Sequence, residues 1–142
     1  MRALLDVNVL IALLDAGHVR HSDARAWLID HAAAGWASCA LTQNGCVRIM
    51  ASPGYPGAHP VAAVAARLRK ATEHPAHAFW PCDLSLLDVD RVNEAHLLGP
   101  RQLTDVYLLA LAVRHGGRVV TMDARITPAA VQGARAEHLC VI

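Results

Sequence analysis

Three aspartates occupy positions from which their carboxylates could bind one metal ion. Asp6 ends an apolar segment, Asp123 follows a β-branched segment, and Asp105 begins a long apolar helical pattern. Carboxylates gathered at close range repel one another, so one of them would stay protonated unless a cation lies between them. Mg²⁺ and Mn²⁺ prefer such oxygen ligands. A water on such an ion becomes more acidic and can attack phosphorus, so this trio suggests metal-assisted hydrolysis of a phosphodiester.

Each aspartate also has a simpler interpretation. Asp105 follows Thr104 and suits the positive end of a helix. Asp6 could cap the helix that follows it, and Asp123 could begin a turn. Taken singly, these interpretations are as good as the chemical one. Taken together, two aspartates that end separate apolar strands favour a shared site.

The aspartates depend on strands that alternate with helices. We predict strands at residues 2–6, 36–41, 77–81, 118–122 and 139–142. Helices are expected at 9–14, from 22 to before Gly35, from Thr42 to 50, at 60–72, at about 89–98 and at 105–115. Ser22, Thr42 and Thr104 are the predicted caps. Short apolar strands alternating with helices are typical of an α/β/α sandwich with a central, mostly parallel sheet. In such folds the ligand site lies at the carboxyl ends of the strands.

Composition limits the other possibilities. The chain has 142 residues, of which 54% are hydrophobic and 18% charged, as expected for a single domain over 1–142. The net charge of +1 does not by itself indicate nucleic-acid binding. Residues 31–72 lack acids and contain four basic residues, which form either a solvated face or a phosphate-facing surface. Without a signal peptide pattern or a membrane-spanning apolar run, we expect a cytoplasmic protein whose four cysteines are free thiols.

Four stretches together resemble one known family. They are Leu-Leu-Asp-Val-Asn-Val-Leu-Ile-Ala-Leu-Leu (4–14), Leu-Thr-Gln-Asn-Gly-Cys-Val-Arg-Ile-Met (41–50), Leu-Thr-Asp-Val-Tyr-Leu-Leu-Ala-Leu-Ala (103–112) and Arg-Val-Val-Thr-Met-Asp-Ala-Arg-Ile (118–126). In order and spacing they resemble PIN domains, and the second stretch is similar to one VapC-type branch. The resemblance covers nearly the whole chain.

This resemblance implies a toxin of a type II toxin–antitoxin pair. Such proteins are Mg²⁺- or Mn²⁺-dependent endoribonucleases, commonly homodimeric and held inactive by a cognate VapB-type antitoxin. The family's first, third and fourth acids correspond to Asp6, Asp105 and Asp123, which would be the catalytic metal ligands. Asn8 and Thr121 correspond to polar positions that would hydrogen-bond around those ligands.

One position departs from the family. The helix after the second strand usually carries a Glu, but here that register falls within Gln43, Asn44 and Gly45. Gln43 or Asn44 could supply a carbonyl oxygen or hold a metal-bound water. With one anionic ligand fewer, metal affinity should be weaker. The alternative function is therefore a weak or inactive PIN module that mainly binds an antitoxin or RNA.

Other acid-using α/β classes fit less well. A haloacid-dehalogenase-type phosphohydrolase needs Asp-x-Asp after the first strand, whereas this chain has Asp6-Val7-Asn8. That class and receiver domains both need a lysine near a late strand. The only lysine, Lys70, falls in an earlier predicted helix. No glycine-rich phosphate loop or dinucleotide motif is present.

Overall fold

A five-stranded parallel sheet forms the centre of the computed structural model, which describes residues 1–57 and 59–142. The spatial order is β3-β2-β1-β4-β5. The strands are β1 (Ala3–Leu5), β2 (Trp36–Cys39), β3 (His77–Trp80), β4 (Arg118–Thr121) and β5 (Leu139–Val141). All five predicted strands are confirmed, and so is the α/β class. Because β1 lies centrally and pairs with β4, the residues after these two strands become neighbours.

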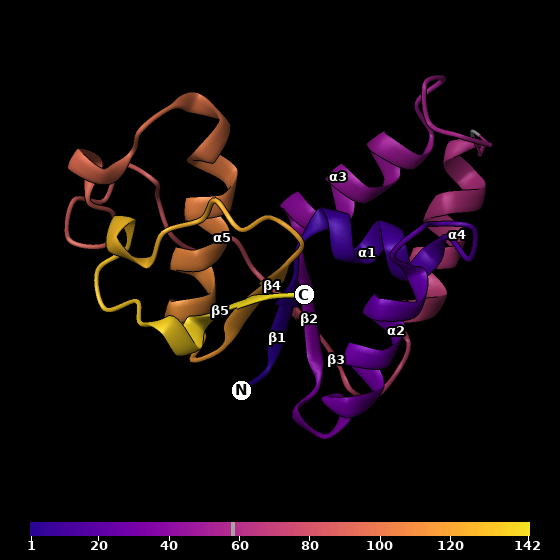
Figure 1. Ribbon diagram of the computed structural model, residues 1–142, viewed down its shortest axis with the longest axis horizontal. Coiled ribbons are helices and arrows are strands. Elements are labelled where there is room, and N and C mark those ends of the chain that lie inside the picture. The colour runs from indigo at the N-terminus through magenta and orange to yellow at the C-terminus, as the bar shows by residue number, and fades with distance from the viewer. Residues whose placement is uncertain (58) are drawn as a thin grey trace.

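Helices cover the two faces of the sheet unequally. Figure 1 shows α5 on one side and the other four α-helices on the opposite side. The helices are α1 (Val7–Leu14), α2 (His21–Asp30), α3 (Ala40–Met50), α4 (Val61–Thr72) and α5 (Leu103–Arg114). The long connections on either side of α5 share its face of the sheet. The arrangement is therefore a layered sandwich of the predicted kind.

Each face of the sheet has its own core. Leu4 and Val119 point to the α5 side, where Leu108 and Leu109 are fully buried. Leu5 belongs to the opposite core with α1 and α4, as the alternation of strand side chains requires. Full burial of each such side chain stabilises the fold by about 1.5–3 kcal/mol. Two cores on one sheet fix the strand register, and with it the positions of the residues that follow the strands.

Three predicted helix starts are displaced. Helix α3 begins at Ala40, so Thr42 lies in its first turn rather than at the cap. Its hydroxyl nevertheless accepts a hydrogen bond from the Cys39 backbone N–H at 3.0 Å. Ser22 and Thr104 also lie inside their helices rather than before them. These helices therefore begin one or two residues earlier than predicted, which is the usual uncertainty of a helix boundary.

The helix predicted at about 89–98 is wrong. Only a short 3-10 turn (Glu94–His96) forms there. The Asn93 N–H donates to the Ala130 carbonyl at 2.9 Å, and the Gln132 N–H donates to the Arg91 carbonyl at 2.8 Å. This pairing uses backbone groups that a helix would need internally, and it buries Val92. The segment is a long connection that wraps the α5 side.

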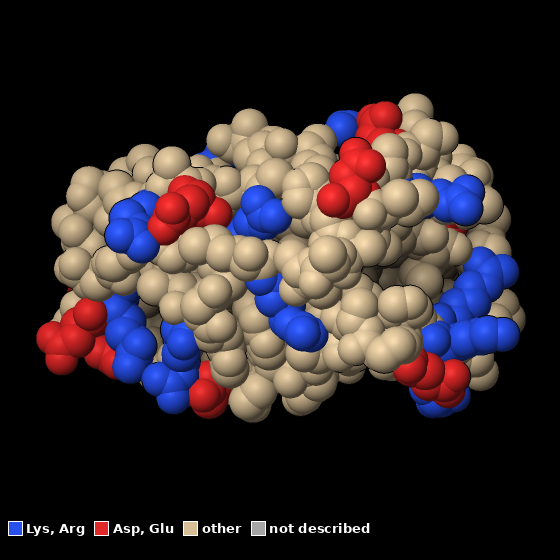
Figure 2. Space-filling view, turned by 90° about the horizontal axis from the view of Figure 1, so that it is seen from below, with Lys and Arg blue, Asp and Glu red and all other residues tan. Residues whose placement is uncertain are grey.

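The surface carries charges of both signs. On the face seen in Figure 2, basic and acidic side chains are interspersed and much of the surface is uncharged, in agreement with the net charge of +1. Cys39 and Cys46 are buried, and all four cysteines are free thiols. In the described part of the chain, no helix is long and apolar enough to cross a membrane.

Candidate active site

The three predicted aspartates line one cavity at the carboxyl edge of the sheet. Asp6 follows β1 and caps α1, accepting a hydrogen bond from the Val7 N–H at 2.7 Å. Asp105 lies in the first turn of α5, and Asp123 follows β4. The cavity has a volume of about 280 Å³, and its other lining residues are Val7, Asn8, Ile11, Ile49 and Thr104. Parallel strand pairing thus brings together acids that are up to 117 positions apart in sequence.

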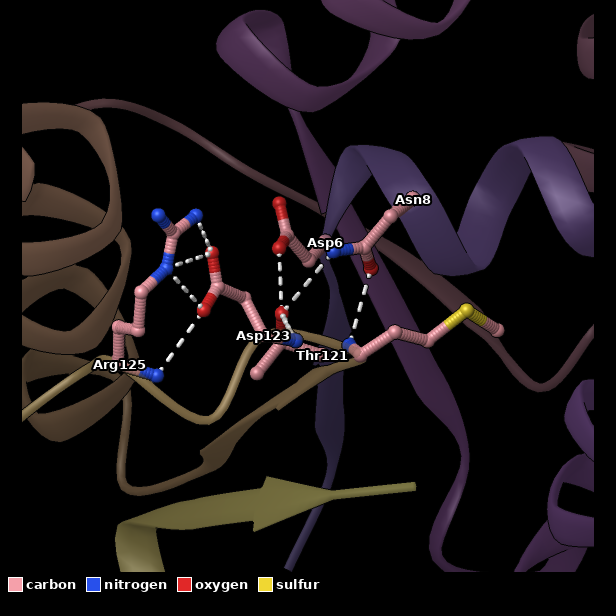
Figure 3. A network of polar contacts seen from close by, with 6 residues as sticks. Asp6, Asn8, Thr121, Asp123 and Arg125 are labelled. Carbon is pink, nitrogen blue, oxygen red and sulfur yellow. Dashed lines mark hydrogen bonds and ion pairs between the residues drawn. The ribbon is translucent and has the colours of Figure 1, made fainter. Parts of the chain in front are cut away.

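Thr121 joins the two halves of this site. Its hydroxyl is fully buried and donates to Asp6 Oδ2 at 2.6 Å. The same oxygen accepts from Asn8 Nδ2 at 3.2 Å and from the Asp123 backbone N–H at 3.1 Å. A hydroxyl offers one donor and two acceptor positions, so Thr121 is fully satisfied. Figure 3 shows this network between the end of β4 and the start of α1.

Asn8 completes the connection. Its side-chain carbonyl accepts a hydrogen bond from the Met122 backbone N–H at 3.2 Å while its amide donates to Thr121. Asn8 and Thr121 therefore have the hydrogen-bonding position expected of them around Asp6. Their contacts fix the orientation of the Asp6 carboxylate, which is only 6% exposed.

The electrostatics of the cavity distinguish the three acids. Burial raises the pKa of Asp6, although the Thr121 and Val7 hydrogen bonds oppose this shift. Burial also raises the pKa of Asp105 to about 6, with further contributions from the negative charges of Asp6 and Asp123. These causes show that the three carboxylates interact through space. A cation in the cavity would attract all three carboxylates and so offset their mutual repulsion.

Arg125 is a site residue that the sequence analysis missed. Its Nε lies 2.9 Å from Asp123 Oδ1, and its Nη2 lies 2.5 Å from Asp123 Oδ2 (Figure 3). This paired guanidinium lowers the pKa of Asp123 to about 2. Its position in the sequence could have revealed it. A turn after Asp123 brings the residue two positions later back to the same carboxylate, and that residue is Arg125.

Gln43 and Asn44 are not brought into the acid cavity. They line a different hollow of about 510 Å³ between α3 and α4. The Gln43 amide donates to the buried Ser38 hydroxyl at 2.9 Å, which is held in turn by His77 at 2.8 Å. Helix α3 borders the acid cavity through Ile49 instead. Gly45 packs against Val7, since a Cβ there would lie 2.7 Å from Val7 Cγ2.

The donor chemistry of the cavity fits a hard divalent cation. Its polar lining consists of oxygen donors from three aspartates, Asn8 and Thr104. Within residues 1–57 and 59–142, no group of three His, Cys, Asp or Glu side chains is arranged to hold an ion as it stands. One reason is that the Asp123 carboxylate is turned toward Arg125 rather than toward the other two acids. Asp6 and Asp105, by contrast, form no ion pair among the described residues.

Comparison with known proteins identifies the family of this chain. The family model described as "PIN domain" matches residues 3–131. Together with its full-length relatives, this match shows that the chain belongs to the PIN domain family, in its VapC branch. The chain is 51% identical to "Ribonuclease VapC44" of Mycobacterium tuberculosis over 142 residues, the whole of both chains. It is 40% identical to "Ribonuclease VapC39" of the same species, over 94% of this chain and 96% of that one.

A solved structure supports the same fold. The crystal structure of Mycobacterium tuberculosis VapC20, described as a "Sarcin-Ricin loop cleaving toxin", aligns with a TM-score of 0.58. The alignment covers 82% of this chain and 85% of that one at 15% identity. At this identity the likeness concerns the fold alone. The resemblance inferred from the four sequence stretches is thereby confirmed at the level of the family.

Proposed function

We propose that the chain is an endoribonuclease that uses Mg²⁺ or Mn²⁺ to hydrolyse RNA phosphodiester bonds, with residues 1–142 acting as one domain. The observation that carries this proposal is the shared cavity of Asp6, Asp105 and Asp123, in which burial and then the repulsion from the other two carboxylates raise the pKa of Asp105. Membership in a family whose full-length relatives are named ribonucleases supports the choice of RNA.

In this proposal Asp6 and Asp105 hold the metal, and Asp123 holds the metal or its water. The bound ion would make a coordinated water more acidic and neutralise charge on the phosphoryl oxygens. Thr121 and Asn8 keep the Asp6 carboxylate in one orientation through their hydrogen bonds. Asp105 carries no such hydrogen bond among the described residues, so its contribution is charge placed directly at the cavity.

The proposed partners follow from the family. They are an RNA substrate, a VapB-type antitoxin that inhibits the chain, and a second copy in a homodimer, all in the cytoplasm.

A second candidate function rests on Gln43. Helix α3 contains no Asp or Glu, so it brings no fourth acid to the cavity, and the Gln43 amide is hydrogen-bonded to Ser38 instead. A chain with weak metal affinity could act mainly by binding an antitoxin or RNA. This alternative predicts RNA or antitoxin binding without metal-dependent cleavage.

Cleavage of total RNA by the purified chain tests both candidates. The wild type should degrade RNA with Mg²⁺ or Mn²⁺ and stop in EDTA, whereas Asp6→Asn and Asp105→Asn should be inactive. Asp90→Asn is the matched control, because Asp90 is an exposed aspartate in a turn remote from the cavity. Calorimetric titration with Mn²⁺ should show binding that both site variants lose. Equal RNA integrity with the wild type and the two site variants would refute the nuclease and leave the binding module.

A further inference from the structure

A second cavity adjoins the acid site. It has a volume of about 300 Å³ and is lined by residues 98–102, Asp105 and Arg125. Asp105 lines both cavities, so the two share a wall. A volume of about 300 Å³ is at the lower end of the range for small-ligand sites. A chain that lies across the acid cavity could thus continue into this one.

Two arginines give the second cavity its charge. Arg101 is exposed and has no carboxylate within ion-pair distance among the described residues. The Arg125 side chain is 76% exposed, and its only ion-pair partner in the described part of the chain is Asp123. The guanidinium fork matches phosphate oxygens in a bidentate manner. The cavity therefore places two guanidinium groups directly beside the acid site, with the Asp105 carboxylate on the wall that the two cavities share.

An RNA nuclease with three carboxylates in its site needs such cations. RNA carries one negative charge per phosphate, and the acids repel the phosphates that flank the one being cut. A metal ion compensates this repulsion only at its own position. Leu98, which is 81% exposed at the edge of the same cavity, adds an apolar surface that a sugar or base can contact.

We propose that Arg101 and Arg125 bind the RNA backbone phosphate that adjoins the scissile one, in the cavity beside Asp105. This inference rests on the proposed ribonuclease function and extends it to a substrate-binding subsite. Arg125 then exchanges its bonds with Asp123 for bonds with the phosphate. The exchange frees the Asp123 carboxylate to face the acid cavity, so RNA binding and metal binding favour each other.

RNA binding without metal tests the subsite separately from catalysis. The probe is a short fluorescent single-stranded RNA of mixed sequence, and its anisotropy is followed in EDTA at several salt concentrations. Arg101→Gln and Arg125→Gln should each weaken binding by roughly tenfold, and together by roughly a hundredfold. Each should also reduce the slope of log K against log salt by about 0.7, the value for one phosphate contact on a single strand.

Arg135→Gln is the matched control. Arg135 is also exposed, at 73%, and also pairs with a carboxylate, Glu137, but it lies outside the second cavity. Its removal should leave both affinity and slope unchanged, and thermal unfolding should confirm that all variants fold.

Two results would overturn the subsite. One is equal affinity and slope for the wild type and the cavity variants, including no measurable binding by any of them. The other is an equal loss with Arg135→Gln, which would show that any surface arginine suffices. If Arg125 only positioned Asp123, cleavage would fall while the salt slope stayed constant. A wild type that binds RNA through these arginines but never cleaves it would refute the nuclease and leave the subsite intact.

Discussion

Replacing Asp105 by Asn should stabilise the metal-free protein at pH 7. The Asp105 carboxylate is partly buried, is repelled by Asp6 and Asp123, and accepts no hydrogen bond from the described residues. In the absence of a metal ion its charge therefore opposes folding. The neutral amide of Asn has nearly the same shape and removes that charge.

The raised pKa of Asp105 sets the size and the sign of this effect. One pKa unit corresponds to about 1.4 kcal/mol. The rise from 3.8 to about 6 therefore gives an upper bound of about 3 kcal/mol. Because the carboxyl is only partly buried, solvent screening reduces the expected gain to about 1–2 kcal/mol. Between pH 3.8 and about 6 the folded protein keeps a proton that the unfolded chain has lost. The free energy of unfolding therefore falls across this window, and the full penalty applies above it.

Urea unfolding in EDTA measures this difference directly. At pH 7, Asp105→Asn should raise the free energy of unfolding by about 1–2 kcal/mol and the melting temperature by roughly 3–6 °C. Near pH 4 the variant and the wild type should be almost equally stable. Asp90→Asn should have little effect at either pH, since Asp90 is exposed and outside the cavity. A variant that is neutral or destabilised at pH 7, or one whose gain persists near pH 4, would refute the reasoning.

Three other changes test the same site. Thr121→Val should cost about 1–3 kcal/mol in urea unfolding, because it removes the hydrogen bond to the buried Asp6 Oδ2, and Thr121→Ser should restore most of the loss. Gly45→Ala should lower the free energy of unfolding by about 1–3 kcal/mol, because its Cβ would press on Val7. Adding Val7→Ala should recover this loss, and a loss that persists would contradict the contact between positions 45 and 7. Calorimetry should show Mn²⁺ binding about tenfold weaker near pH 5 than at pH 7, because protons compete with the metal for the Asp105 carboxylate. An affinity that does not change between these pH values would exclude Asp105 as a ligand.

The sequence was sufficient to predict the sheet and the acids at its edge. Strand signals are local, because a short apolar run ended by an aspartate marks β1, and a short β-branched run marks β4. The parallel arrangement then follows from alternation with helices, and it places Asp6 and Asp123 at one edge without further information. Asp105 was found in the same way, from an apolar helix that begins at that edge.

Features that depend on distant partners could not be predicted in this way. The segment before α5 has enough apolar residues for a helix, but its backbone pairs with residues near Val131, about forty positions later. Arg125 shows the same difficulty at short range. Its position after Asp123 is visible in the sequence, whereas the choice of a carboxylate partner depends on the turn geometry.

Gln43 illustrates how a distant partner decides a site residue. The sequence shows only that a neutral residue stands where the family usually carries an acid. In the structure, Gln43 donates to Ser38, and Ser38 Oγ can donate to His77 Nε2. A carboxylate at position 43 would instead accept the Ser38 proton and leave His77 to donate from the nitrogen that now accepts. The amide is therefore the better match for this network. The structure thus gives Gln43 a hydrogen-bonding role of its own, apart from the cavity that Asp6, Asp105 and Asp123 line.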